Sequence, residues 1–154
     1  MRNTQQHLVQ LSAQADLKAN IVITASALLL TVGATKIEDR QLRVSILILS
    51  VGCAAALLLA ILAVLPAATK RRGEGGGNPL FFVDAAAMSQ DEFLDAMAAA
   101  CETDAGVYDL QARDLYEFSA YLANSKFRRL RRAYVAFLLG VVIASLHQVV
   151  QAFR

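Results

Sequence analysis

Apolar residues in this chain gather in three long blocks instead of recurring on one face of short periodic segments. The blocks run over about 19–37, 44–69 and 133–150, and only Lys36, near the end of the first, carries a charge. A helix needs roughly 17–25 apolar residues to cross the hydrocarbon core of a bilayer. The pattern therefore predicts an integral membrane protein with three transmembrane helices.

A cleaved signal peptide and the buried core helices of a soluble protein are the alternatives to membrane spans. The signal peptide is disfavoured because the first block follows the largely polar residues 1–18 and ends in no small-residue cleavage motif. Buried core helices are disfavoured because so short a chain could hardly cover an apolar run as long as 44–69. With 56% hydrophobic residues and no alternation of β-branched and aromatic residues, the sequence predicts an all-α fold.

The positive charges set the expected orientation. Eleven of the 15 Lys and Arg residues lie before the first block or between the second and third, and four lie in the other two segments. Segments rich in Lys and Arg stay in the cytoplasm. We therefore expect a multi-pass membrane protein with a cytoplasmic N-terminus and a C-terminus on the opposite side of the membrane.

Segment 70–132, between the second and third blocks, is predicted to form a small helical cytoplasmic head. It begins with a glycine-rich linker, and Pro79 then indicates a turn or an extended stretch. Ser89 and Glu92 have the spacing of a capping box that opens a helix. After a break at 103–106, a long helix is predicted to start near Val107 and to run on into the third block. The whole chain, 1–154, is interpreted as a single membrane domain.

Apolar stripes on both sides of the membrane-spanning blocks predict how the helices pack. Leu8, Leu11, Ala15 and Ala19 recur along the segment before the first block, and Leu115, Phe118, Leu122 and Ser125 recur along the long helix. Within the blocks, Gly52 with Ala56 and Gly140 with Ala144 have the four-residue spacing of small residues that permits close helix contact.

No catalytic or metal-binding set stands out. His7 and His147 are predicted on opposite sides of the membrane, and Cys53 and Cys101 in different solvents, so neither pair can bind a metal. No nucleophile has a positioned base, and the glycines of the linker lack phosphate-loop spacing. We expect no enzyme activity, no cofactor and no metal. The net charge of +2 is too small to indicate nucleic acid.

The densest charge cluster, 126–132, has two interpretations. It can anchor the protein at a surface of anionic lipids, or some of its residues can bind an anionic ligand, since arginine suits phosphate oxygens. For the second interpretation, the candidate ligand-binding residues supply phosphate contacts, base stacking or an amide contact. They are Arg113, Lys126 and Arg129 for the phosphate and Asn78, Phe81 and Phe82 for the base.

Some of these residues also have a structural alternative. Phe81 and Phe82 could instead form an apolar plug of the head. Asp16 and Lys18 lie in an apolar helix near the membrane surface and are candidate structural or gating residues. Asp16 could pair with a basic residue of the long helix or line a ligand pocket.

Several segments carry a resemblance to a known family. They are Ala15-Asp16-Leu17-Lys18-Ala19, Asn78-Pro79-Leu80-Phe81-Phe82, Ala112-Arg113-Asp114-Leu115-Tyr116, Lys126-Phe127-Arg128-Arg129-Leu130, and Arg132-Ala133-Tyr134 continuing to Phe137 and Gly140. In order and spacing the chain resembles the membrane-spanning Pycsar effectors, bacterial antiphage proteins that act downstream of a cyclic nucleotide. Val83, Ser119 and Phe127 depart from the family's usual residues.

The resemblance implies a non-enzymatic antiphage defence effector. A cyclic nucleotide second messenger, of the cyclic pyrimidine mononucleotide class, would activate it, and a homo-oligomer would then impair the inner membrane and cause abortive infection. The lipid bilayer is its other implied partner. The alternative from a different class is a small membrane anchor or scaffold that recruits a soluble partner and forms no pore.

Overall fold

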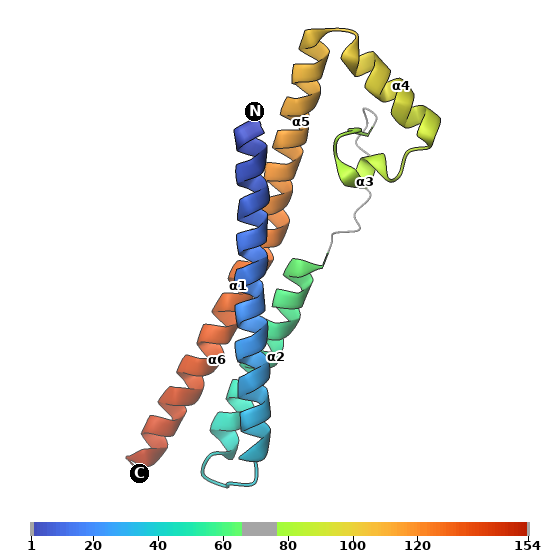
Figure 1. Cartoon of the computed structure of the whole chain (residues 1–154). Coiled ribbons are helices and arrows are strands. Elements are labelled where there is room, and N and C mark those ends of the chain that lie inside the picture. The colour runs from blue at the N-terminus through green and yellow to red at the C-terminus, as the bar shows by residue number, and fades with distance from the viewer. Residues whose placement is uncertain (1, 66–76, 154) are drawn as a thin grey trace. The chain divides into compact units, whose positions relative to one another are not determined.

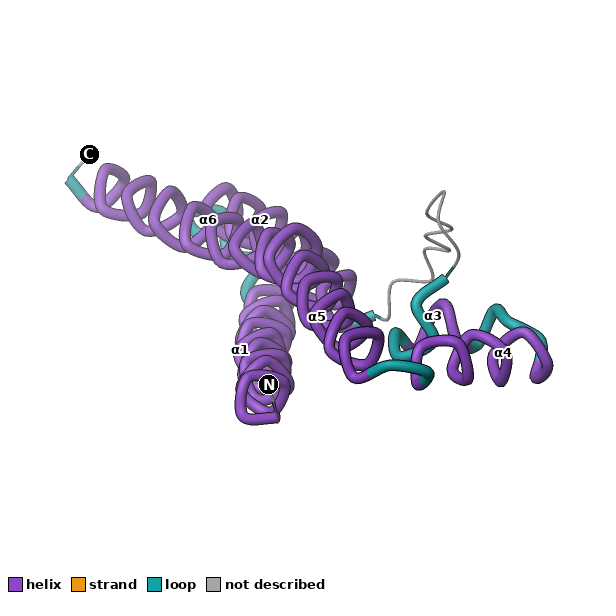
Figure 2. The backbone as a smooth tube through the Cα atoms, turned by 90° about the horizontal axis from the view of Figure 1, so that it is seen from above, coloured by secondary structure: helices purple, strands orange, loops and turns teal. Residues whose placement is uncertain are grey.

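The computed structural model describes residues 2–65 and 77–153, and all regular structure in these ranges is helical (Figure 1; Figure 2). The side chains of Arg2, Phe82 and Val83 are outside the description. The elements are α1 (Arg2–Thr35), α2 (Arg43–Val64), α3 (Phe82–Ala85), α4 (Gln90–Cys101), α5 (Asp104–Tyr121), a π-helical segment η1 (Leu122–Phe127) and α6 (Arg128–Ala152).

The predicted fold class is confirmed. Three helical runs are long and apolar enough to cross a membrane: Asn3–Thr35, Arg43–Val64 and Asp104–Ala152. The third run combines α5, η1 and α6, so the helix predicted to continue into the third apolar block does so.

The chain divides into two compact units. We call Met1–Ser12 with Pro66–Ala123 the head unit, and Ala13–Leu65 with Asn124–Arg154 the span unit. The chain passes between them within α1, after Leu65 and within η1. Each unit has its own packing and is described separately.

In the span unit, α2 and α6 run antiparallel and pack through small residues. Ser45 near the start of α2 contacts Gln148 near the end of α6, and Leu62 near the end of α2 contacts Arg129 near the start of α6. The buried positions recur at steps of three and four residues, as in helix bundles. They include Ala19, Val22 and Ser26 of α1, Cys53, Ala56, Ala60 and Ala63 of α2, and Leu130, Ala133 and Ala144 of α6.

The closest approach of α2 and α6 is at Gly52 and Gly140. A Cβ atom placed on Gly52 would lie 2.5 Å from the Gly140 Cα atom, and one on Gly140 would lie 2.8 Å from the Gly52 Cα atom. No side chain fits there, so glycine at both positions permits the contact. The close helix contact that the small-residue spacing predicts is confirmed.

The ends of the first two apolar helices fall short of the apolar blocks. α1 ends at Thr35, within the block that reaches 37. α2 ends at Val64, and Leu65 has φ −57° and ψ 130°, the extended conformation that a residue before proline favours. The remainder of the second block, 66–69 with Pro66, lies outside the described residues.

In the head unit, side chains that cap helix ends fix α4 and α5. The Ser89 hydroxyl accepts a hydrogen bond from the Glu92 backbone N–H at 3.2 Å, and Glu92 Oε2 accepts one from the Ser89 N–H at 2.8 Å, which confirms the capping box. Thr103 caps α5 by accepting from the Gly106 N–H at 3.0 Å. α5 therefore begins at Asp104, earlier than the predicted Val107, because the threonine hydroxyl satisfies a first-turn donor.

Both predicted stripes face protein. Leu8 and Leu11 are half-buried and Ala15 and Ala19 are buried, while Leu115 and Phe118 are half-buried and Leu122 is buried. The stripe of Leu115, Phe118, Leu122 and Ser125, of which Ser125 is also half-buried, runs from α5 into η1. A π-helical segment adds a residue to a helical turn and thereby shifts the faces of the helix on either side of it.

Candidate functional site

An ion pair joins the first helix to η1 within the span unit. The Lys126 Nζ atom donates to Asp16 Oδ2 at 2.8 Å and lies 2.7 Å from Asp16 Oδ1. The Lys126 side chain is 8% exposed and the Asp16 side chain 39% exposed. This is the pairing of Asp16 with a basic residue of the long helix that the sequence offered as one of two alternatives.

Two further contacts tie α6 to the other helices of the span unit. Arg129 Nη1 donates to the backbone carbonyl of Leu62 at 2.8 Å. The last carbonyls of a helix lack partners within the helix and attract positive charge, so Arg129 satisfies the end of α2. The Tyr134 hydroxyl donates to the Lys18 carbonyl at 3.2 Å, and the Lys18 side chain is exposed.

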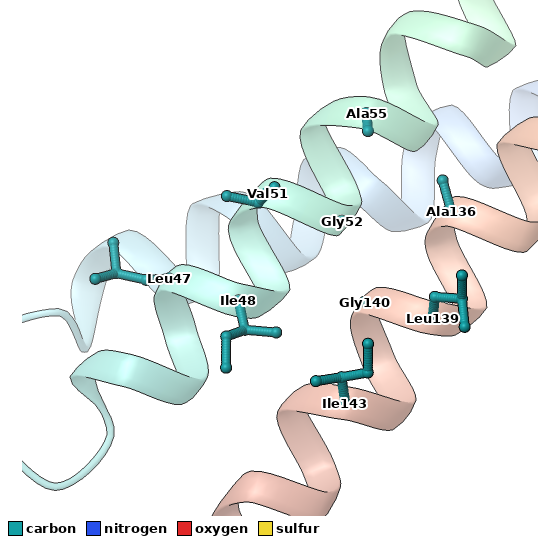
Figure 3. Close-up of a pocket in the computed structure, with 9 residues that line it drawn as sticks. All are labelled: Leu47, Ile48, Val51, Gly52, Ala55, Ala136, Leu139, Gly140 and Ile143. Atoms are coloured by element: carbon teal, nitrogen blue, oxygen red, sulfur yellow. The ribbon is translucent and has the colours of Figure 1, made fainter.

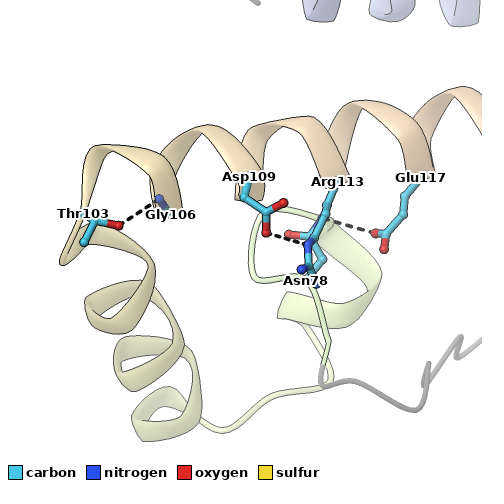
Figure 4. Close-up of polar contacts among 6 residues, drawn as sticks. All are labelled: Asn78, Thr103, Gly106, Asp109, Arg113 and Glu117. Atoms are coloured by element: carbon cyan, nitrogen blue, oxygen red, sulfur yellow. Dashed lines mark hydrogen bonds and ion pairs between the residues drawn. The ribbon is translucent and has the colours of Figure 1, made fainter.

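Asn78 organises the turn near the start of the described range 77–123 of the head unit (Figure 4). Its backbone N–H donates to Asp84 Oδ2 at 3.0 Å, and its side-chain Nδ2 donates to Glu117 Oε2 at 3.2 Å. Its side-chain Oδ1 accepts from the Leu80 N–H at 3.1 Å. The residue is 6% exposed. A buried amide this well bonded holds the turn against α5 and would have to exchange a contact to bind a base.

Arg113 has the most accessible charge among the three basic ligand-binding candidates. Its Nε donates to Asp109 Oδ2 at 2.9 Å, one turn earlier on α5, and the two side chains are 66% and 62% exposed. An exposed pair of this kind is worth about 0.3–0.5 kcal/mol. The guanidinium can therefore exchange its partner at small cost. Figure 4 shows Asp109, Arg113 and Glu117 on the face of α5 that meets Asn78.

The aromatic candidates lie next to this turn. Phe81 is half-buried, and its backbone N–H donates to the Asn78 carbonyl at 3.0 Å. Phe82 begins α3, and its side chain lies outside the described residues. The candidates thus divide into a head-unit group, Asn78, Phe81, Phe82 and Arg113, and a span-unit group, Asp16, Lys18, Lys126 and Arg129.

Sequence reasoning missed the polar partners. Glu117 and Asp84 hold Asn78, and Gln5 Nε2 donates to Asp114 Oδ2 at 2.9 Å in the head unit. From the sequence, Asp114 and Glu117 can be placed near Arg113 on the surface of the predicted long helix. The neighbouring residues in the sequence do not identify the groups to which they bond.

A second missed group lies near the other end of the α2–α6 pair. The Ser45 hydroxyl donates to Gln148 Oε1 at 2.9 Å and lies 2.8 Å from His147 Nδ1. Polar residues at the start of one apolar run and the end of another were a usable signal, because antiparallel helices bring such ends together. Among the described residues, no group of three or more His, Cys, Asp and Glu side chains could hold a metal ion.

Comparison with protein families gives a match that covers almost the whole chain. The family model described as the Pycsar effector protein domain matches residues 1–151. Comparisons with curated proteins and with solved structures gave no match. The family is not a known catalytic one, and it links a cyclic nucleotide signal to antiphage defence at a membrane. With this match over its apolar helices and both candidate groups, the chain belongs to the Pycsar effector family.

Proposed function

We propose that this chain is a cyclic-nucleotide-activated effector that assembles as a homo-oligomer in the bacterial inner membrane and impairs it, so that infected cells stop growing before phage mature. The family match over residues 1–151 is the observation that supports this proposal most. The helical run Asp104–Ala152, which passes from head-unit residues to span-unit residues, supports it further. Such a helix can convert ligand binding into a change in the membrane only if the ligand prefers one of two states.

The proposed ligand is a cyclic pyrimidine mononucleotide. Its candidate contacts in the head unit are Arg113 for the phosphate and Phe81 or Phe82 for the base, and its candidate contacts in the span unit are Lys126 and Arg129 for the phosphate. Arg113 has only an exposed pair to exchange. Lys126 and Arg129 have intramolecular contacts that a phosphate would have to replace, namely the Asp16 carboxylate and the Leu62 carbonyl. Replacement of one of these contacts would itself alter the packing of the span unit, which is what a signal-gated membrane effector requires.

Nucleotide binding should depend on the basic candidates. We expect Arg113→Ala, Lys126→Ala and Arg129→Ala each to weaken affinity for the activating cyclic mononucleotide about tenfold to a hundredfold, because a charge-assisted hydrogen bond contributes roughly 1.5–3 kcal/mol. Affinities of the detergent-purified variants are measured by calorimetry after a thermal-shift screen of cyclic mononucleotides and dinucleotides.

Arg40→Ala is the matched control, because Arg40 is exposed in the turn between α1 and α2. Equal affinity in all four variants, with normal membrane insertion, would contradict the assignment of these residues. The activating nucleotide should also release dye from liposomes that contain the wild-type protein. Binding without release under any nucleotide would favour the anchor or scaffold alternative instead.

The proposed orientation predicts which face of the membrane exposes Cys101. Cys101 is exposed at the end of α4 in the head unit, whereas Cys53 is buried in α2. An impermeant maleimide should label Cys101 in inverted inner-membrane vesicles and leave it unlabelled in intact spheroplasts, because the Lys and Arg excess keeps that segment in the cytoplasm.

Cys101→Ser, which retains only Cys53, gives the background of this labelling. Efficient labelling of wild-type protein in intact spheroplasts, absent from Cys101→Ser, would reverse the orientation.

A further inference from the structure

An apolar groove runs along the α2–α6 pair of the span unit (Figure 3). Its volume is about 500 Å³, and its floor is the contact between Gly52 and Gly140. Larger apolar side chains form its walls, Leu47 and Val51 on α2 and Leu139 and Ile143 on α6. About half or more of each wall residue's surface is exposed. We call this the α2–α6 groove.

A second hollow adjoins the groove at the arginine end of α6. It has a volume of about 480 Å³ and is lined by Arg128, Arg131, Arg132 and Val135. It shares Ala136 and Leu139 with the α2–α6 groove. The two hollows therefore form one continuous surface that is strongly basic at one end and entirely apolar along the rest.

The three arginines of this hollow differ from their neighbour Arg129. Arg129 is bonded to the Leu62 carbonyl. In the part of the chain that the structure describes, by contrast, the exposed guanidinium groups of Arg128, Arg131 and Arg132 have no ion pair or hydrogen bond. Guanidinium groups match phosphate oxygens with forked hydrogen bonds. The basic end of the surface is thus ready to bind an anion.

We propose that this surface is a binding site for one anionic phospholipid, with its phosphate on the arginines and an acyl chain in the α2–α6 groove. Arg128, Arg132, Val135 and Leu139 follow one another at steps of three and four residues, so they share one face of α6. At 1.5 Å per residue, Leu139 lies about 10 Å along the axis from Arg132. A chain leaving a headgroup at the arginines would reach Leu139 within its first half. Basic pockets at the ends of membrane helices are typical sites for anionic headgroups.

The shape and charge of the surface favour a lipid over a second copy of this chain. The groove is deep at Gly52 and Gly140 because neither residue has a Cβ atom. A helix with its side chains is about 10–12 Å across and is too wide to follow this floor. A hydrocarbon chain is much thinner and follows such a groove closely. A second copy placed symmetrically over the hollow would also bring its own three arginines to the basic end, where like charges repel.

The test uses the absence of tryptophan from the sequence. A single tryptophan is introduced as Leu139→Trp, and in a separate variant as Val51→Trp on the opposite wall. Each variant is reconstituted in phosphatidylcholine vesicles that contain a minor fraction of brominated phosphatidylglycerol, and in phosphatidylglycerol vesicles with the same fraction of brominated phosphatidylcholine. The site predicts several-fold stronger quenching by the brominated anionic lipid at either position.

Charge variants then separate this site from general surface charge. Arg128→Gln, Arg131→Gln and Arg132→Gln, combined in the Leu139→Trp background, should weaken the apparent affinity for phosphatidylglycerol at least tenfold and abolish the preference. Lys18→Gln is the control, since Lys18 is exposed on α1, outside the groove, and its carbonyl contacts Tyr134 of α6. The Lys18→Gln variant should keep the preference for phosphatidylglycerol.

Three outcomes would overturn the proposal. Equal quenching by the two brominated lipids would mean that the groove does not select an anionic lipid. An equal loss of preference in the Lys18→Gln variant would reduce the effect to surface charge. Protection of both tryptophans from both lipids would place a second copy of the chain in the groove.

Discussion

Replacing Gly52 with alanine should destabilise the protein by about 1–3 kcal/mol, the usual cost of forcing an extra carbon into a packed contact. The new Cβ atom would lie 2.5 Å from the Gly140 Cα atom and 3.3 Å from the Ala136 carbonyl oxygen. Both are backbone atoms, so no side chain can turn away to make room. The helices α2 and α6 must separate, and they then lose the packing on either side of the glycines.

Gly33→Ala is the matched control for this substitution. Its Cβ atom would meet the side-chain Cγ2 atom of Ile46 at 3.3 Å and the Ser50 Oγ atom at 3.8 Å, both in side chains. Gly33 is in α1, where alanine gains up to about 1 kcal/mol of helix propensity. Stability is compared by circular dichroism during thermal unfolding in one mild detergent. If the two variants unfold at the same temperature, the close approach of α2 and α6 is contradicted.

The contact at Gly52 shows which part of the packing was predictable. Small residues four apart mark a face on which a membrane helix can approach another, so both Gly52 and Gly140 could be selected from the sequence. That these two faces meet each other is decided by the antiparallel arrangement of α2 and α6. The Ser45 contacts with His147 and Gln148 depend on the same arrangement, and the polar residues at these two helix ends were a signal for them that went unused.

The starts of α4 and α5 in the head unit both have local causes, yet only the start of α4 was predicted. The Ser89 capping box was predicted because both of its hydrogen bonds join residues three apart. The start of α5 was predicted too late because Gly106 was assigned to the break between the two helices. In the structure the Thr103 hydroxyl accepts a hydrogen bond from the Gly106 N–H, so residues 104–106 belong to the first turn of α5.

The candidate site was predictable as a set of residues but not as a set of contacts. Asn78 was selected for an amide that could contact a base, yet its amide bonds to Glu117, 39 residues away. Sequence spacing carries no information on a contact of that range. The change to a π-helix at Leu122–Phe127 was not predicted either, because the apolar stripe of Leu115, Phe118 and Leu122 continues into it as in an ordinary helix.

Asp16 and Lys126 should prove to be the most costly ion pair to break in the described part of the chain. Asp16→Ala removes the carboxylate that contacts a lysine side chain only 8% exposed. Removal of one partner of a buried pair typically costs about 3–5 kcal/mol, because the remaining charge stays out of water. Since Asp16 itself is 39% exposed, water reaches the pair from one side, and we expect a loss of about 3 kcal/mol in the same unfolding measurement.

A double substitution that removes both charges separates the cost of a buried charge from the other effects of losing Asp16. Asp16→Leu with Lys126→Met replaces both charges by apolar side chains, and such a replacement is often close to neutral for a buried pair. We therefore expect the double variant to be more stable than Asp16→Ala. The exposed pair Asp109 and Arg113 is the control within the same protein, because its side chains are 62% and 66% exposed and Asp109→Ala should cost less than about 0.5 kcal/mol. If Asp16→Ala costs no more than Asp109→Ala, the contact between Asp16 and Lys126 does not hold the first helix to η1.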